Sequence, residues 1–139
     1  MSLEIKLTDF TPKVLAEFAE RVDVGLDEIG YLAEGYAVAA IESSPRRVDT
    51  GLLRNSITHA RSGQPPSRQT YQSTDGTKSG SYSGTADSGG KAVYIGTNVD
   101  YAGYVHDGTS RMEANRFLEA AADHGDQYRE VMKRALSGE

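Results

Sequence analysis

The sequence predicts an α+β fold, in which a long N-terminal helix and a C-terminal helix pack on a small antiparallel β-sheet beside a long Gly/Ser-rich loop or arm. Apolar residues recur with helical spacing over 12–43, and β-branched and aromatic residues alternate near 92–98. Between them, residues 62–91 are rich in glycine and serine. The chain has 139 residues, so we expect a single domain, 1–139, with an extended arm at 62–91.

The first helix is expected over residues 12–43. Thr11 can cap it, Pro12 suits its first position, and Pro45 stops it. Three glycines inside it each cost roughly 1 kcal/mol relative to alanine, so either the helix bends or another element approaches closely. The glycines are Gly25, Gly30 and Gly35. The apolar stripe is Leu15, Phe18, Val22, Leu26, Ile29, Ala33, Tyr36 and Ala40.

The sheet is expected to have three to five strands, including 52–60 and 92–98. In the first, Leu53 and Ile57 would share one face, although the alternation is imperfect. In the second, Val93 and Ile95 face one side. A short helical turn should follow, with Asp100 as its N-cap and Gly108 as the left-handed residue that ends it.

The arm, 62–91, has too few apolar residues to pack a core of its own. We expect an extended segment or hairpin that is ordered by neighbouring subunits or partner proteins, with Tyr71 and Tyr82 as anchors. Lys91 follows Gly90, but the glycine spacing of a P-loop is missing.

The second helix is expected over 114–136, continuous through Gly125, with its apolar face on the sheet. Lys133 and Arg134 in its last turn suit the negative end of the helix dipole. Phe117 and Leu118 should be its core anchors, each worth roughly 3–5 kcal/mol if truncated to alanine.

Composition excludes several classes of function. The chain has no cysteine, so it forms no disulfide and no thiolate metal site. The three histidines, His59, His106 and His124, lack zinc-ligand spacing, and we expect no metal and no cofactor. No apolar run could cross a membrane, and the first ten residues alternate apolar and charged residues, unlike a signal peptide. We therefore expect a soluble protein made inside a cell.

Charge is uneven along the chain. Residues 1–44 carry nine acidic and three basic residues, a net charge of −6, whereas 45–70 carry five arginines and Asp49, a net charge of +4. A solvated acidic helix beside a basic loop would explain this pattern. The alternative is that acidic and basic surfaces of neighbouring copies meet in a ring. The total charge of −5 argues against a dedicated nucleic-acid binder.

Two motifs admit an enzymatic interpretation. Asp49-Thr50-Gly51 matches the tripeptide of aspartic proteases, in which two carboxylates share a proton and activate water. However, Leu52 stands where a small polar residue is usual, and a long helix precedes the motif, so a turn is the better interpretation. His106-Asp107 beside Tyr104 could serve acid–base chemistry, but such a histidine is more often structural.

Two ordered clusters carry a family resemblance. They are Val48-Asp-Thr-Gly-Leu-Leu-Arg-Asn-Ser-Ile57 and, after a variable insertion, Val93-Tyr-Ile-Gly-Thr-Asn-Val-Asp-Tyr-Ala-Gly-Tyr-Val-His-Asp-Gly-Thr-Ser110 with Ala114-Asn-Arg-Phe-Leu118. Together they resemble the neck and tail-completion proteins of long-tailed phages, across roughly positions 10 to 136. The sequence departs from that pattern at His106-Asp107, where a glutamate and an aromatic are more usual, and at Asn115-Arg116-Phe117, which lacks the usual proline.

The resemblance implies a virion structural protein, not an enzyme, which joins head to tail as a ring around the DNA channel. Its partners would be further copies of itself, head-closure or connector proteins, and tail-terminator or tail-tube proteins. DNA would pass without sequence-specific binding, and the acidic first helix would line or flank the channel. The protein would be made in the host cytoplasm and reside at the head–tail junction of the virion. A tail terminator, a minor capsid protein and an aspartic-protease-like enzyme using Asp49 are the alternatives.

The candidate residues for subunit or partner contact are basic or aromatic, with one aspartate. Tyr101 and Tyr104 are amphipathic and suit an interface or a core equally well. The full set is Arg46, Arg47, Asp49, Arg54, Tyr71, Tyr82, Tyr101, Tyr104, Arg111 and Arg116.

Overall fold

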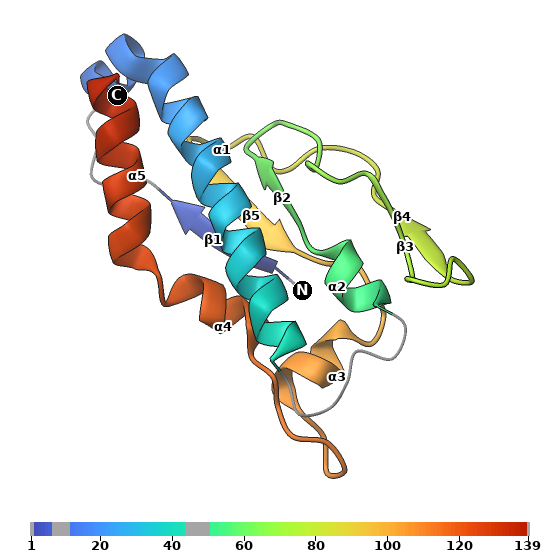
Figure 1. Ribbon diagram of the computed structural model, residues 1–139. Coiled ribbons are helices and arrows are strands. Elements are labelled where there is room, and N and C mark those ends of the chain that lie inside the picture. The colour runs from blue at the N-terminus through green and yellow to red at the C-terminus, as the bar shows by residue number, and fades with distance from the viewer. Residues whose placement is uncertain (1, 7–11, 44–50, 139) are drawn as a thin grey trace.

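The computed structural model describes residues 2–6, 12–43 and 51–138, without the side chains of 6 and 12–18. Its elements are β1 (Ser2–Lys6), α1 (Pro12–Glu42), α2 (Leu52–Ser56), β2 (Thr58–Arg61), β3 (Thr70–Gln72), β4 (Ser79–Ser81), β5 (Ala92–Gly96), α3 (Ala102–Asp107), α4 (Phe117–Ala122) and α5 (Gly125–Ser137). The α+β prediction, with two principal helices and a small antiparallel sheet, is confirmed (Figure 1).

The central sheet has the strand order β1-β5-β2, and both outer strands run antiparallel to β5. Val93 and Ile95 are fully buried on one face while Tyr94 is only half-buried, as alternation requires. The strand predicted at 92–98 is therefore confirmed over Ala92–Gly96. Strand β1 was not predicted, although the apolar and charged residues that alternate in this stretch are the pattern of a half-buried strand.

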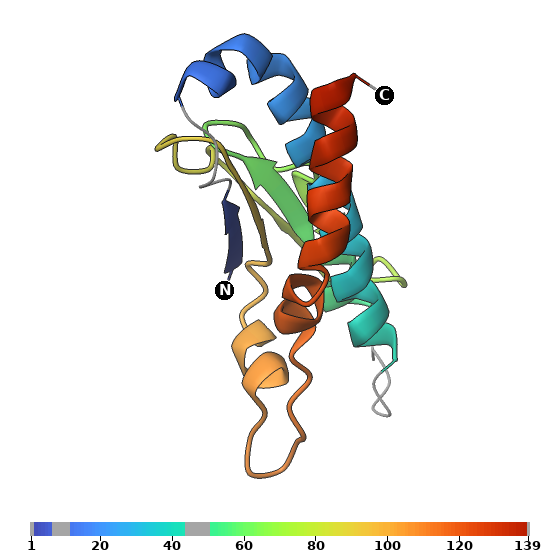
Figure 2. The same ribbon diagram turned by 90° about the vertical axis from the view of Figure 1, so that its left-hand side faces the viewer.

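Helix α1 crosses the sheet, and α5 lies antiparallel beside it (Figure 1). Both helices cover the same face of the sheet (Figure 2). The part of the predicted stripe whose side chains are described is buried, wholly at four positions and partly at Tyr36 and Ala40. The four are Val22, Leu26, Ile29 and Ala33.

Two of the three helix glycines mark close approaches. A Cβ on Gly25 would lie 2.8 Å from Met132 Sδ of α5, and a Cβ on Gly30 would lie 2.2 Å from His59 Cδ2 of β2. At Gly35 a Cβ would meet nothing within 4 Å. Packing thus explains the first two glycines but not the third.

The strand predicted at 52–60 is wrong in its first half. Gly51 takes a left-handed conformation (φ 75°) and accepts the Asn55 N–H at 2.9 Å, so residues 52–56 form helix α2 and the strand begins only at Thr58. Leu53 and Ile57 are both buried. They are four residues apart, a spacing that brings side chains together on a helix as well as on a strand, so the short apolar run was ambiguous.

The continuous helix predicted at 114–136 is also wrong, because the chain forms two helices that are broken at Asp123 and His124. The ring of His124 stacks on Tyr36 of α1, with 3.4 Å between ring centroids. Tyr128 hydrogen-bonds across the break to the Ala121 carbonyl at 2.5 Å. Helices α4 and α5 both pack on α1, and α4 also contacts β1. Phe117 and Leu118 are buried, as predicted.

The predicted helical turn is α3, but Asp100 does not cap it. Tyr101 occupies the N-cap position, and no side chain makes a capping hydrogen bond there. Gly108 ends the helix with a positive φ of 80°, but its ψ of 171° lies outside the left-handed helical region that was predicted. Its Cβ would also lie 2.8 Å from the Ala114 nitrogen, so only glycine fits where the chain folds back.

Candidate interaction surfaces

The two segments that carry the family resemblance meet inside the protein. Ser56 of α2 and Thr97 after β5 are buried, and their hydroxyl oxygens lie 2.6 Å apart in a hydrogen bond. Ser56 Oγ also lies 2.6 Å from the Leu53 carbonyl, while Thr97 Oγ1 accepts the Val99 N–H at 3.1 Å. These motif hydroxyls are therefore used to join the two segments and are not presented to a ligand.

The arm folds into a β-hairpin, because β3 and β4 pair with Tyr71 opposite Gly80. Two asparagines of the motif segments hold it, one at each outer edge. Asn55 Nδ2 donates to the Gln72 carbonyl of β3, and Asn98 Nδ2 donates to the Ser81 carbonyl of β4, both at 2.8 Å. The hairpin is thus oriented by its own chain.

Tyr71 and Tyr82, the predicted anchors of the arm, also bind the chain's own backbone and side chains. Tyr71 is buried and donates to Asn98 Oδ1, while Tyr82 donates to the Ser56 carbonyl at 2.7 Å. Their rings pack with 5.5 Å between centroids. Burial, and secondarily the neighbouring Tyr82, raises the pKa of Tyr71. These tyrosines fix the arm to the body. Because Tyr71 is buried, little of its side chain is accessible to a partner.

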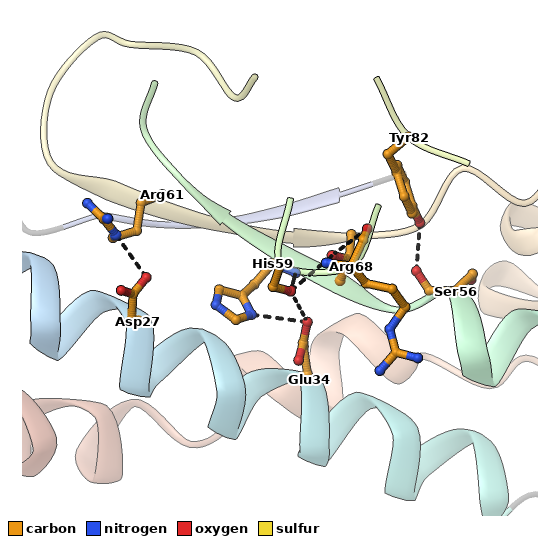
Figure 3. Close-up of polar contacts among 9 residues, drawn as sticks. Asp27, Glu34, Ser56, His59, Arg61, Arg68 and Tyr82 are labelled. Atoms are coloured by element: carbon orange, nitrogen blue, oxygen red, sulfur yellow. Dashed lines mark hydrogen bonds and ion pairs between the residues drawn. The ribbon is translucent and has the colours of Figure 1, made fainter. Parts of the chain in front are cut away.

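The acidic helix and the basic segment partly neutralise each other within one chain. Arg61 of β2 lies 2.8 Å from Asp27 (Figure 3) and 3.5 Å from Asp23, and Lys91 lies 3.0 Å from Asp23. Arg54, a predicted contact residue, lies 3.5 Å from Glu42 and donates to Thr74 Oγ1. These carboxylates therefore contact basic groups of their own chain, and fewer acidic groups remain on α1 to line a DNA channel.

A polar cluster around the buried His59 links α1, β2 and the arm (Figure 3). His59 Nδ1 lies 3.0 Å from Glu34 Oε1 and makes no hydrogen bond with the described residues. Ser67 donates to the same carboxylate at 2.8 Å and accepts the His59 backbone N–H at 3.3 Å. In a catalytic triad the serine hydroxyl would instead face the imidazole. The geometry is that of a structural link.

His106 is a second buried histidine. Its Nδ1 lies 2.8 Å from Asp107 Oδ1, and its ring packs edge-on against Phe117, with 5.1 Å between ring centroids. Its Nε2 is enclosed by the chain and makes no hydrogen bond with the described residues. A substrate therefore has no access to this nitrogen in this conformation, and His106 connects α3 to α4.

Large apolar side chains are exposed in two places. On α3, Tyr101 is 40% exposed and Tyr104 is 66% exposed. On the outer face of α1, Val24, Tyr31 and Leu32 are 57%, 63% and 37% exposed. Sequence analysis selected the two tyrosines of α3 but missed the α1 residues. The sequence indicates this face only in part, since Val24 and Tyr31 are spaced so that they share one face of a helix, opposite the buried stripe, while Glu28 and Gly35 of that face are not apolar.

The remaining predicted contact residues are basic or acidic. Arg111 is exposed in the loop after α3, and Arg116 is exposed beside Glu119, 3.0 Å away. Arg46, Arg47 and Asp49 lie outside the described residues.

A shallow groove lies on the hairpin beside Asn55 of α2 and is lined by Arg68, Thr70, Gln72 and Ser79, among others. It lacks the apolar lining that is typical of small-molecule sites. Among the described side chains, no cluster of three or more His, Asp or Glu residues is arranged to hold a metal ion. Within the same ranges, no helix has the length and apolar character to cross a bilayer.

Comparison with known proteins gives no further assignment. No protein-family model matches the sequence, and neither a curated protein nor a solved structure is significantly similar to it.

Proposed function

We propose that the protein is a structural component of the head–tail junction of a long-tailed phage, which assembles into a ring with further copies of itself. The observation that carries this proposal is the pair of exposed apolar surfaces: Val24, Tyr31 and Leu32 on α1, and Tyr101 and Tyr104 on α3. Exposed apolar side chains that gather on one surface are typical of interaction sites. Two different patches on one chain suit the head-to-tail contacts from which rings are built.

The arrangement of the motif residues also supports an assembly role. The polar side chains of the motif segments, such as Ser56, Thr97 and Asn98, form internal hydrogen bonds. They join the two motif segments and hold the hairpin of the arm in a fixed orientation relative to the body. A protein that acts by shape needs such rigid projections. DNA would pass through the ring without sequence-specific contact, and the other partners would be connector and tail proteins.

The test uses phage particles that lack this protein. Filled heads and tails of normal length should accumulate separately, and purified protein should restore joined, infectious particles. Electron microscopy should then place a closed ring at the junction. Particles that join normally without the protein would contradict the proposal. Tails of uncontrolled length would instead indicate a tail terminator, because an uncapped tube continues to polymerise.

The Asp49→Asn variant separates this proposal from the aspartic-protease alternative. A protease would lose all cleavage of phage structural proteins, because its catalytic carboxylate would be missing. A structural protein should still restore joined particles. Loss of cleavage products in virions made with this variant would favour the enzyme.

A further inference from the structure

The arm, 62–91, is tied to the body mainly by polar contacts. Only one of its large side chains, Tyr71, is buried. Three residues of the body receive the arm, and we call them the socket: the side-chain amides of Asn55 and Asn98 donate to its backbone, and the Ser56 carbonyl accepts a tyrosine hydroxyl from it. Contacts of this kind separate at lower cost than an apolar core, so the arm can leave the socket while the body stays folded.

The arm is also closed on itself at its base. The Gly63 N–H donates to the Ala86 carbonyl and the Ala86 N–H donates to the Gln64 carbonyl, both at 3.0 Å. Beyond these two hydrogen bonds, β3 and β4 pair with each other, and the two tyrosine rings of the arm pack with 5.5 Å between centroids. Residues 64–86 therefore form one unit, which we call the distal arm.

A tight turn connects β2 to the distal arm. The Gln64 N–H donates to the Arg61 carbonyl at 2.9 Å, and Gly63 takes a positive φ of 75°. Pro65 and Pro66 follow the turn directly. Because proline fixes its own φ and holds the preceding residue in an extended conformation, the segment after the turn is stiff. A short turn beside a stiff extended segment is a hinge that favours exchange of the following element between copies.

The return connection, residues 87–90, places no obstacle to such an exchange. It is exposed throughout, so it can straighten without uncovering apolar side chains. The socket has one ligand whose fit the structure shows, which is the distal arm itself. A second copy carries an identical distal arm, so every contact with the socket can form again between two copies. Neighbouring copies in a ring are held at a high local concentration, which favours contacts between chains.

We propose that the distal arm of each copy in the assembled ring docks in the socket of the next copy. The turn at Gly63 opens, and Asn55 and Asn98 then hold β3 and β4 of the neighbour by the hydrogen bonds that they form within one chain here. The contact is heterologous, because an arm meets a socket, and its repetition by rotation closes a ring. This inference rests on the proposed ring function and names the contact that links the copies.

Thiol cross-linking tests the exchange, because the chain has no cysteine of its own. Arg54 Nη2 donates to Thr74 Oγ1 of the arm at 3.1 Å, so these two positions report docking. Arg54→Cys and Thr74→Cys variants, one of them isotopically labelled, are mixed in equal amounts, assembled onto particles and treated with a short bis-maleimide. The expected product is a mixed dimer linked between positions 54 and 74. The double variant, which should link within one chain when free and dilute, shows that the two thiols are within reach. Gln127→Cys on the exposed face of α5 is the control and should not link to position 74.

The outcomes separate the exchange from the function. If the single variants join particles but give no mixed dimer, although the double variant links, the exchange is wrong and the ring function stands. If the wild type itself never joins particles, the proposed function fails.

A hinge variant tests the same exchange without phage particles. In concentrated free protein, Gly63→Val should raise the yield of the 54–74 mixed dimer by about tenfold or more, because a β-branched residue resists the positive φ that the closed turn requires. Gly84→Val is the matched control: Gly84 has a similar φ of 79° but lies inside the distal arm, so the yield should stay at the level of the unmodified hinge. Equal yields from the two variants would overturn the proposal.

Discussion

The body and the arm of this protein are held together by different forces. In the body, apolar side chains such as Val22, Ile95 and Phe117 are fully buried between α1, the sheet and α4. The arm, 62–91, buries only Tyr71 and Ser73. It depends instead on hydrogen bonds from Asn55, Asn98 and its own tyrosines. Damage to the body should therefore unfold the whole chain, and damage to the arm should remain local.

Phe117→Ala should have the largest effect. Phe117 is fully buried and packs against His106, so truncation leaves a cavity in the body. We expect a loss of about 3–5 kcal/mol in the free energy of unfolding, measured by urea denaturation. A loss comparable to that of an arm variant would show that the body is less tightly packed than its burial indicates.

Gly30→Ala should destabilise the body by roughly 1–3 kcal/mol, because its Cβ would collide with the buried His59 ring. This loss should appear despite the better helix propensity of alanine. Gly35→Ala is the matched control, since its Cβ meets open space, and it should stabilise the protein by up to about 1 kcal/mol. If the two variants have the same stability, the close approach of α1 and β2 is wrong.

Asn98→Ala should loosen the arm while the body stays folded. The substitution removes two hydrogen bonds, one donated to the Ser81 carbonyl and one accepted from the Tyr71 hydroxyl. Each hydrogen bond contributes about 1 kcal/mol to stability. Hydrogen exchange should accelerate in the hairpin but not in β5 or α1. Equal acceleration in both regions would mean that the arm and the body unfold as one unit.

Alkaline pH should weaken the body through Tyr128. Burial, and secondarily Tyr36, raises the pKa of Tyr128 from 10 to about 12. The stability contributed by the neutral phenol is fully present below pH 10 and is lost as the pH rises from 10 to 12. A Tyr128→Phe variant should be slightly less stable at neutral pH, because it loses the hydrogen bond to Ala121. Its thermal midpoint should fall less steeply over this window than that of the wild type.

Acid should disturb the tip of the arm through Asp75. The backbone N–H of Thr77, followed by the hydroxyls of Ser73 and Thr77, lowers the pKa of Asp75 from 3.8 to about 2. The stabilisation is present above pH 4 and is lost as the pH falls from 4 to 2. Amide NMR signals of the tip should shift in this range. Asp75→Ala should produce the shifted signals already at neutral pH.

Part of the candidate surface could be predicted from the sequence. Tyr101 and Tyr104 were selected as amphipathic residues in a short helical turn, and they are exposed on α3. The exposed apolar residues of α1 were missed because the first helix has apolar residues on both faces, and spacing alone does not say which face the sheet covers. The arm was expected to depend on partners. Its contacts with Asn55 and Asn98 join residues 17 positions apart, and such pairings leave no local pattern.

The sequence by itself determined the α+β class, helix α1, strand β5 and the Gly/Ser-rich arm, because periodicity and composition are local properties. Tertiary structure alone decided the rest. It made residues 52–56 helical, where spacing allowed either form, and it broke the second helix at His124, whose ring stacks on Tyr36. It also paired Arg61 with Asp27, charges that the sequence could equally have assigned to neighbouring copies. These outcomes depend on which distant residues come within a few ångströms, and that is fixed only when the chain packs.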